Sequence, residues 1–247
     1  MENVRHNFHI HTLQSSCAKP DMTVENIIFR AEEEGLEIIG LSDHFHQQNR
    51  DFFEMASTLR QELEVISTPI DVLVGCEAQM ISPVEVSIDQ NVAQILDYVM
   101  ISADHYHLSE VENPKEHSAL SYAVHYLKML EGAIDTGFCD VIVHPFTLSK
   151  VRGIDRLKAL KMYDRDELVR ILTKAASKKV SLELNPNHIS LAPWFFRELS
   201  EISCNTGMKF TIGTDAHSLS AIGYSIKKIK ELGFSQEDFV IRPQMVE

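Results

Sequence analysis

Phe8-His9-Ile10-His11 is a short apolar segment that delivers two imidazoles at its end, and the chain repeats this arrangement. Later apolar runs end in the same kinds of side chain, at Asp43-His44, Glu77, His105, His144 and Asp215-Ala216-His217. One such histidine would mean little. Six run ends that agree predict a cluster of metal ligands at one edge of the fold.

Seven strand-like segments alternate with helix-like segments along the chain. Val and Ile are frequent in the predicted strands, which are 4–10, 37–42, 71–76, 97–102, 139–143, 180–184 and 209–213. The predicted helices are 23–34, begun by Thr23 and ended by Gly35, and 52–66, 88–96, 118–136, 165–177, 194–206 and 219–232. Repeated β-α units imply a parallel sheet, and closure into a barrel puts every carboxyl end on one rim. An open doubly wound sheet is the alternative, but it usually binds ligands at one crevice. We therefore expect an α/β barrel forming one domain, residues 1–247.

Composition limits the classes of partner. The 247 residues carry a formal net charge of −13, which disfavours nucleic acid as the main partner because binding its backbone requires a basic surface. The same charge disfavours an anionic substrate unless bound cations reverse the local field.

The location of the protein is also constrained. Met1-Glu2-Asn3 has neither the basic start nor the apolar stretch of a signal peptide, and no apolar run approaches the ~18 residues of a membrane helix. The cysteines Cys17, Cys76, Cys139 and Cys204 form no C-x-x-C pair. We expect a cytoplasmic protein without a membrane partner.

Three of the run ends suit metal binding, two by the spacing of their residues and one by its buried carboxylate. His9 and His11 are two residues apart on a strand, so both rings face the same side and can hold one ion. Asp215 and His217 repeat this spacing. Glu77 closes an apolar strand, where a carboxylate is costly to bury unless cations pair with it, and a carboxylate can bridge two ions.

Taken together, these motifs resemble the PHP family, named after polymerase and histidinol phosphatase. The resemblance runs from about residue 4 to 223 and is carried in family order by His9-x-His11, Ser42-Asp43-His44, Gly75-Cys76-Glu77, Val143-His144-Pro145 and Thr214-Asp215-Ala216-His217. It implies a distorted seven-stranded TIM-like barrel, two or three divalent metal ions and phosphoesterase activity.

The resemblance also implies how the ligands are shared. One ion would take His9, His11, Glu77 and Asp215, and Glu77 would bridge to a second ion held by His105 and His144. A third would take His44, His217 and a residue from the loop after the first strand. Cys17 stands where family members often have histidine. It is either a zinc-binding thiolate or a plain buried thiol, and His107 is the alternative to His105.

The predicted chemistry is in-line attack on phosphorus by a metal-bridging hydroxide. Zinc is the expected metal, with manganese and iron as alternatives. His44, His217 or an aspartate would protonate the leaving alkoxide, and Asp43 would orient a neighbouring imidazole. The candidate substrate contacts are Lys150, Arg152, Asn185, His188 and His107, although Lys150 and Arg152 also fit a solvated turn and Asn185 fits an Asn-Pro turn.

Three other functions compete with a small-molecule phosphatase. A metal-dependent amidohydrolase would usually bridge its metals through a modified lysine, which no middle strand end supplies. A PHP-type nuclease conflicts with the net charge of −13. A non-enzymatic metal-binding module would have lost ligands. The size of the chain favours the histidinol phosphatase branch and histidine biosynthesis, with Glu110 and Glu112 as partners for a substrate ammonium, whereas the oligomeric state is left open.

Overall fold

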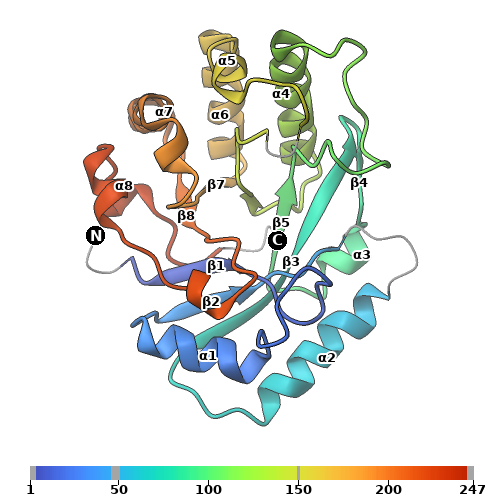
Figure 1. Ribbon diagram of the computed structural model, residues 1–247, viewed down its shortest axis with the longest axis vertical. Helices are drawn as coiled ribbons and strands as arrows, with labels where there is room; N and C mark the ends of the chain where they lie inside the picture. Colours follow the sequence, from blue (N-terminus) through green and yellow to red (C-terminus); the bar gives the residue numbers. More distant parts are fainter. Residues whose placement is uncertain (1–3, 46–50, 149–150, 244–247) are drawn as a thin grey trace.

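The computed structural model describes residues 4–45, 51–148 and 151–243, and its centre is a barrel of parallel strands (Figure 1). Seven strands pair in the order β1-β2-β3-β5-β6-β7-β8, and β4 pairs antiparallel with β3. Their bounds are β1 His6–Ile10, β2 Ile38–Leu41, β3 Asp71–Ser82, β4 Glu85–Val86, β5 Tyr98–Ser102, β6 Val141–Ile142, β7 Ser181–Leu184 and β8 Phe210–Ile212. The predicted α/β barrel is confirmed.

The barrel closes where β1 meets the end of β8. The backbone N–H of His11 donates to the carbonyl of Ala216 at 3.0 Å, and the N–H of Ala216 donates to His9 at 3.1 Å. Nearer the amino end of β1, side chains rather than backbone groups make the hydrogen bonds between β1 and β8. His6 Nε2 accepts from Ile212 N at 3.0 Å, and Asn7 also bonds to this strand's continuation. Closure is therefore nearly complete, as the ligand pattern predicted.

Helices lie outside the barrel and pack on its strands (Figure 1). They are α1 Val24–Glu33, α2 Phe52–Glu64, α3 Gln90–Ala93, α4 Ala119–Asp135, α5 Arg156–Leu160, α6 Arg165–Ser177, α7 Pro193–Thr206 and α8 Lys227–Glu231. Thr23 caps α1 as predicted, because its side chain accepts from Asn26 N.

Two predicted helices are wrong in extent. The segment predicted as 88–96 is helical only over α3, and 219–232 divides into a 3₁₀ turn, Leu219–Ala221, and the short α8. Tertiary packing overrides helix propensity in both. The hairpin strand β4 and helix α5 were not predicted.

A small apolar cluster fills the barrel below the rim. It contains Phe8, Leu73, Tyr98, Met100, Val141 and Val143. The hydroxyl of Tyr98 donates to the Phe8 carbonyl at 2.6 Å, and its ring fills the space beside two glycines. A Cβ at Gly40 would lie 2.0 Å from the Tyr98 hydroxyl, and one at Gly75 would lie 2.3 Å from the ring. These glycines let the strands approach the ring that closes the floor of the site.

A bulge in β1 lets neighbouring residues of this strand contribute to the apolar cluster inside the barrel and to the ligand cluster at its carboxyl rim. The register with β2 shifts between Asn7 and Ile10, so that β1 has one residue more than its partner. Phe8 can therefore join the interior cluster while the next residue, His9, turns its ring toward the carboxyl end of the barrel.

Candidate metal centre

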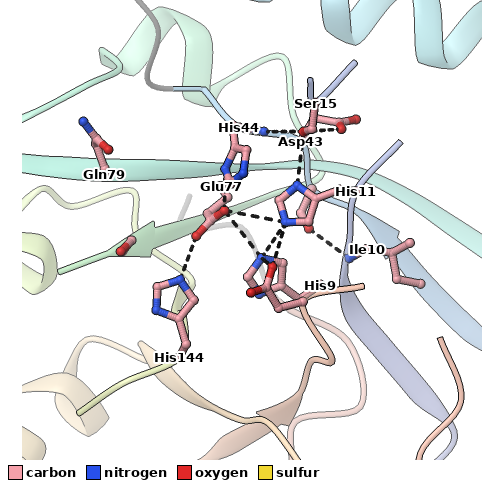
Figure 2. Close-up of polar contacts among 12 residues, drawn as sticks. His9, Ile10, His11, Ser15, Asp43, His44, Glu77, Gln79 and His144 are labelled. Carbon is pink, nitrogen blue, oxygen red and sulfur yellow. Dashed lines mark hydrogen bonds and ion pairs between the residues drawn. The ribbon is translucent and has the colours of Figure 1, made fainter. Parts of the chain in front are cut away.

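Glu77 lies near the middle of the long strand β3, at the centre of a cluster of imidazoles and carboxylates (Figure 2). It is 1% exposed, and its two oxygens face different imidazoles. Oε1 lies 2.9 Å from His144 Nε2 and 3.4 Å from His105 Nε2, whereas Oε2 lies 2.7 Å from His44 Nδ1. A carboxylate placed between two groups of imidazoles has the geometry of a bridging ligand.

The second group of ligand atoms comes from β1 and from the segment after β8. His9 Nε2 and His11 Nε2 are 3.1 Å apart, and Asp215 Oδ1 lies 3.4 Å from the first and 3.1 Å from the second. Both ring nitrogens are also within 3.7 Å of Glu77 Oε2. Four side chains from three separate parts of the sequence therefore converge on one point.

The proton positions in this group favour a cation between the rings. His9 Nδ1 lies 2.8 Å from the Glu183 carboxylate, and His11 Nδ1 lies 3.1 Å from Ser15 Oγ, whose own proton goes to Asp43 at 2.6 Å. Each Nδ1 therefore acts as the donor, so that a neutral ring would present the lone pair of its Nε2 to a bound ion. Two such lone pairs 3.1 Å apart suit an ion that both rings can bind.

The spacing of the ligand atoms agrees with this. Two ligands at about 2.0–2.1 Å from a tetrahedral zinc ion lie roughly 3.4 Å apart. The separations among His9 Nε2, His11 Nε2 and Asp215 Oδ1 are 3.1–3.4 Å. The residues therefore fit a divalent metal by chemistry and by distance.

A third group contains His11, His44 and His217, whose ring nitrogens lie within 4.8 Å of one another. Cys17 lies beside it and hydrogen-bonds with His217 and His44. Burial opposes ionisation of this thiol, but the two imidazoles prevail and lower its pKa to about 6. The structure thus places a readily ionised sulfur next to the imidazoles with which it was predicted to share an ion.

Buried carboxylates give the cluster a strongly negative field. Burial alone would lower the pKa of His9, but the charges of Glu183, Asp215 and Glu77 raise it well above its ordinary value. Burial would raise the pKa of Glu77, but the surrounding imidazoles, His44 foremost, hold it well below its usual range. Glu77 is therefore ionised at neutral pH, and the site attracts cations.

Asp104 orients His144 and was missed in the sequence. Its Oδ1 lies 3.0 Å from His144 Nδ1, which directs the opposite nitrogen of the ring at Glu77. Its Oδ2 accepts from Thr147 Oγ1 at 2.7 Å and from Leu148 N at 2.9 Å. Asp104 therefore fixes both the ring and the loop that carries it.

The loop after β6 and the segment after β8 hold their ligands in strained backbone. His144 has φ +31° and Asp215 has φ +53°, a region that non-glycine residues seldom adopt. Phe146 and Leu148 in the same loop are also left-handed. Such strain persists where the surroundings enforce it, and it clusters at functional sites.

Asp43 was predicted to orient an imidazole, and in the structure it anchors the loop after β1. It accepts from Thr12 N at 2.8 Å, from Thr12 Oγ1 at 2.7 Å and from Ser15 Oγ at 2.6 Å. Ser15 in turn accepts from His11 Nδ1 and from His44 N. Asp43 therefore contacts the cluster through Ser15 rather than directly.

The other predicted residues lie in different places. His105 joins the cluster, whereas His107 is exposed, with its ring centre 5.4 Å from that of His105. Asn185 is buried, and its Oδ1 accepts from Asn187 N, which makes the Asn-Pro turn. His188 is half-buried, and burial lowers its pKa. Arg152 is exposed, and Lys150 is outside the described residues.

A barrel with imidazoles and carboxylates gathered at the carboxyl rim defines the class of metal-dependent barrel enzymes. The family model for the PHP domain matches residues 7–187. The chain therefore belongs to the PHP family, and the predicted assignment to metal-dependent phosphoesterases is confirmed at the level of the family.

Solved structures show the same fold. A histidinol phosphate phosphatase from Lactococcus lactis, complexed with zinc, L-histidinol and phosphate, is 18% identical, with a TM-score of 0.67 over 94% of this chain and 95% of that one. A protein from Listeria monocytogenes assigned as a histidinol phosphatase is 12% identical, with a TM-score of 0.64 over 90% and 98%. Among curated protein sequences, none is similar enough to count as a match. Within the described residues, no helix is long and apolar enough to cross a membrane.

Proposed function

We propose that this chain hydrolyses the phosphate monoester of a small molecule at a centre of two or three divalent metal ions. The observation that supports this best is the placement of Glu77. Its Oε1 lies 2.9 Å from His144 and 3.4 Å from His105. Its Oε2 lies 3.6 Å from His9 and 3.7 Å from His11. A bridging carboxylate between two metal positions suits a reaction that must hold the attacking and the leaving oxygen at once.

The proposed ligand sets are those that the resemblance to the PHP family implies. One ion would be held by His9, His11, Asp215 and Glu77, and a second by Glu77, His105 and His144. A third would be held by His44, His217 and the Cys17 sulfur. Zinc is the proposed metal, because it binds imidazole and thiolate ligands well, whereas harder ions prefer oxygen ligands. Manganese and iron are alternatives for the two sets without sulfur.

Metal ions bound here would lower the pKa of water toward about 7 and neutralise the phosphate oxygens. The protein supplies the rest. Tyr98 and the apolar cluster below Glu77 seal the floor against water. Asn185 Nδ2 and His188 Nδ1 are buried without a hydrogen-bond partner among the described residues, and both follow β7 at the carboxyl rim. We propose that the side chains of these two residues line the substrate site.

Histidinol phosphate is the first substrate to test. The supporting observation is the likeness to the Lactococcus lactis enzyme, whose structure contains L-histidinol and phosphate. Of the two acidic residues proposed for an ammonium group, Glu110 accepts from Gln79 and Glu112 pairs with His125 at 3.2 Å. Both lie in the loop after β5 and would have to exchange these partners for a substrate amine.

The test is turnover that depends on metal. Chelator-stripped protein is supplied with zinc, manganese or iron, and phosphate release is measured across amino-alcohol, sugar and nucleotide monoesters. We expect no release without metal and selective release with it. His105→Ala should lower zinc content and turnover, and His107→Ala, which removes the neighbouring exposed ring, should leave the zinc content unchanged. Normal zinc content without phosphate release from any ester would contradict the phosphatase and leave an amidohydrolase, a nuclease or a non-enzymatic metal-binding module.

A further inference from the structure

Glu183 is a fully buried carboxylate in the middle of β7, and nothing in the predicted ligand set includes it. It is 0% exposed, and among the described residues it forms no ion pair with lysine or arginine. A buried carboxylate is unfavourable unless donors satisfy it. Here the donors belong to two different parts of the metal centre.

The first donor is His9. Glu183 Oε1 lies 2.8 Å from His9 Nδ1, so the ring keeps its proton on Nδ1 and presents the Nε2 lone pair to His11 and Asp215. This is the pairing of carboxylate and imidazole that orients metal ligands in many proteins.

The second donor is the backbone of His144. Its N–H donates to Glu183 Oε2, at the position where the chain adopts φ +31°. That hydrogen bond favours the unusual backbone conformation, which places His144 Nε2 2.9 Å from Glu77 Oε1. Glu183 Oε2 thus positions His144, which is a proposed ligand of the second metal position.

Packing fixes the carboxylate between these donors. A Cβ on Gly213, after β8, would lie 1.8 Å from Glu183 Oε1 and 2.7 Å from His9 Cβ. The absence of a side chain at Gly213 therefore leaves the space that the carboxylate occupies while it contacts both His9 and His144. Strands β1, β6, β7 and β8 all meet at this group.

We propose that Glu183 is a positioning residue that couples the two metal positions bridged by Glu77. One oxygen sets the tautomer of His9 at the first position, and the other sets the backbone that aims His144 at the second. Asp104 differs, because it bonds to the ring of His144 and has no contact with the first position. This inference rests on the proposed metal centre.

Glu183→Gln removes one of the two hydrogen-bond acceptors and leaves the shape of the side chain almost unchanged. Glutamine has the same shape but only one oxygen, so it can accept from one of the two donors, and its NH₂ group faces the other. If the NH₂ faces His9, the ring must move its proton to Nε2, where the metal needs a lone pair. If it faces His144, the N–H of the strained residue loses its acceptor.

The experiment compares zinc binding to metal-free wild type, Glu183→Gln and Asp104→Asn by calorimetry, with the ion count checked by mass spectrometry. We expect Glu183→Gln to weaken two ions by about 10–100-fold each. Asp104→Asn, which removes a carboxylate at the same depth, should weaken mainly one. Cobalt absorption spectra report the ligand geometry independently of turnover.

The outcomes are distinguishable. Wild type that binds no zinc would overturn the metal centre, and the inference with it. Wild type that binds zinc normally, beside a Glu183→Gln protein that loses one ion or none, would overturn the coupling alone. Circular dichroism of the metal-free proteins tests folding. Should Glu183→Gln not fold, Glu183→Asp decides the matter: it must weaken both ions together, and loss of a single ion refutes the proposal.

Discussion

Replacing Glu77 by glutamine tests the centre most directly, because the change keeps the volume of the side chain and removes only its charge and one acceptor oxygen. In the native protein, three imidazole nitrogens lie within 3.4 Å of the carboxylate, distributed over both of its oxygens. Glutamine can offer one oxygen to one metal position, and its NH₂ group would face the other. Both proposed positions are therefore perturbed by one substitution.

The size of the effect follows from the geometry. Loss of a partner that only orients a ligand weakens metal binding by about 10–100-fold. Glu77 is proposed to contact both ions directly, so we expect at least about 100-fold at each position, which is about 2.7 kcal/mol per ion. Removal of one preorganised electrostatic group lowers turnover by about 10²–10³-fold. With two weakened ions we expect a loss of at least 10³-fold, on the order of 4 kcal/mol.

The assay measures zinc per chain after dialysis against a zinc buffer, together with phosphate release at saturating zinc. Glu85→Gln is the matched control, because it makes the same change on the exposed strand β4. The control should retain full metal content and turnover. If Glu77→Gln also retains its zinc, with the affinity of wild type, then Glu77 is no bridge and the assignment of the positions is wrong.

Three further outcomes are expected. Cys17→Ser should lower the occupancy of one ion of three, measured as zinc per chain, while Cys204→Ser, at another exposed cysteine, should change none; equal counts in both variants would remove Cys17 from the ligand set. Gly40→Ala should lower the free energy of unfolding by about 3 kcal/mol or more, because its Cβ would lie 2.0 Å from the Tyr98 hydroxyl; an unchanged denaturant midpoint would show that the ring can move. Burial raises the pKa of Asp140 to about 7 from 3.8, so the folded state loses stability as pH rises between these values. The free energy of unfolding of Asp140→Asn should therefore rise relative to that of wild type between pH 5 and pH 8, by up to about 4 kcal/mol. Denaturant unfolding of both proteins at the two pH values measures this, and a difference between them that does not change with pH would refute it.

Most of the proposed ligands could be located from the sequence because they stand at or near the end of an apolar run. The residue that follows a buried strand emerges at the carboxyl rim, so its position along the chain also gives its position in the barrel. Glu77 and His144 were recognisable in this way, and the structure places both in the cluster. The choice between His105 and His107 required coordinates, since the loop after β5 does not keep the alternation of a strand.

The orienting carboxylates were harder to find. Asp104 lies beside a predicted ligand, and its position in the sequence does not show which ring it orients. Glu183 gave a signal that was overlooked, because a charged residue inside the apolar run Ser181-Leu182-Glu183-Leu184 must be buried with its partners. The partners themselves could not be inferred, since His9 is 174 positions away and the second donor is a backbone N–H.

The balance of charge links the metal centre to the stability of the barrel. Glu77, Asp104, Glu183 and Asp215 place four carboxylates around the imidazoles, and the first three are at most 1% exposed. Without metal, protonation of the rings compensates this negative charge. The carboxylates raise the pKa of His9 and of His144, whereas burial lowers the pKa of His11 and of His105 to about 3. Two divalent ions would balance the four charges with the rings neutral. A third would need the Cys17 thiolate to complete its shell. Binding to the folded state alone stabilises that state, so the ions that carry the chemistry would also relieve the electrostatic strain at the centre of the fold.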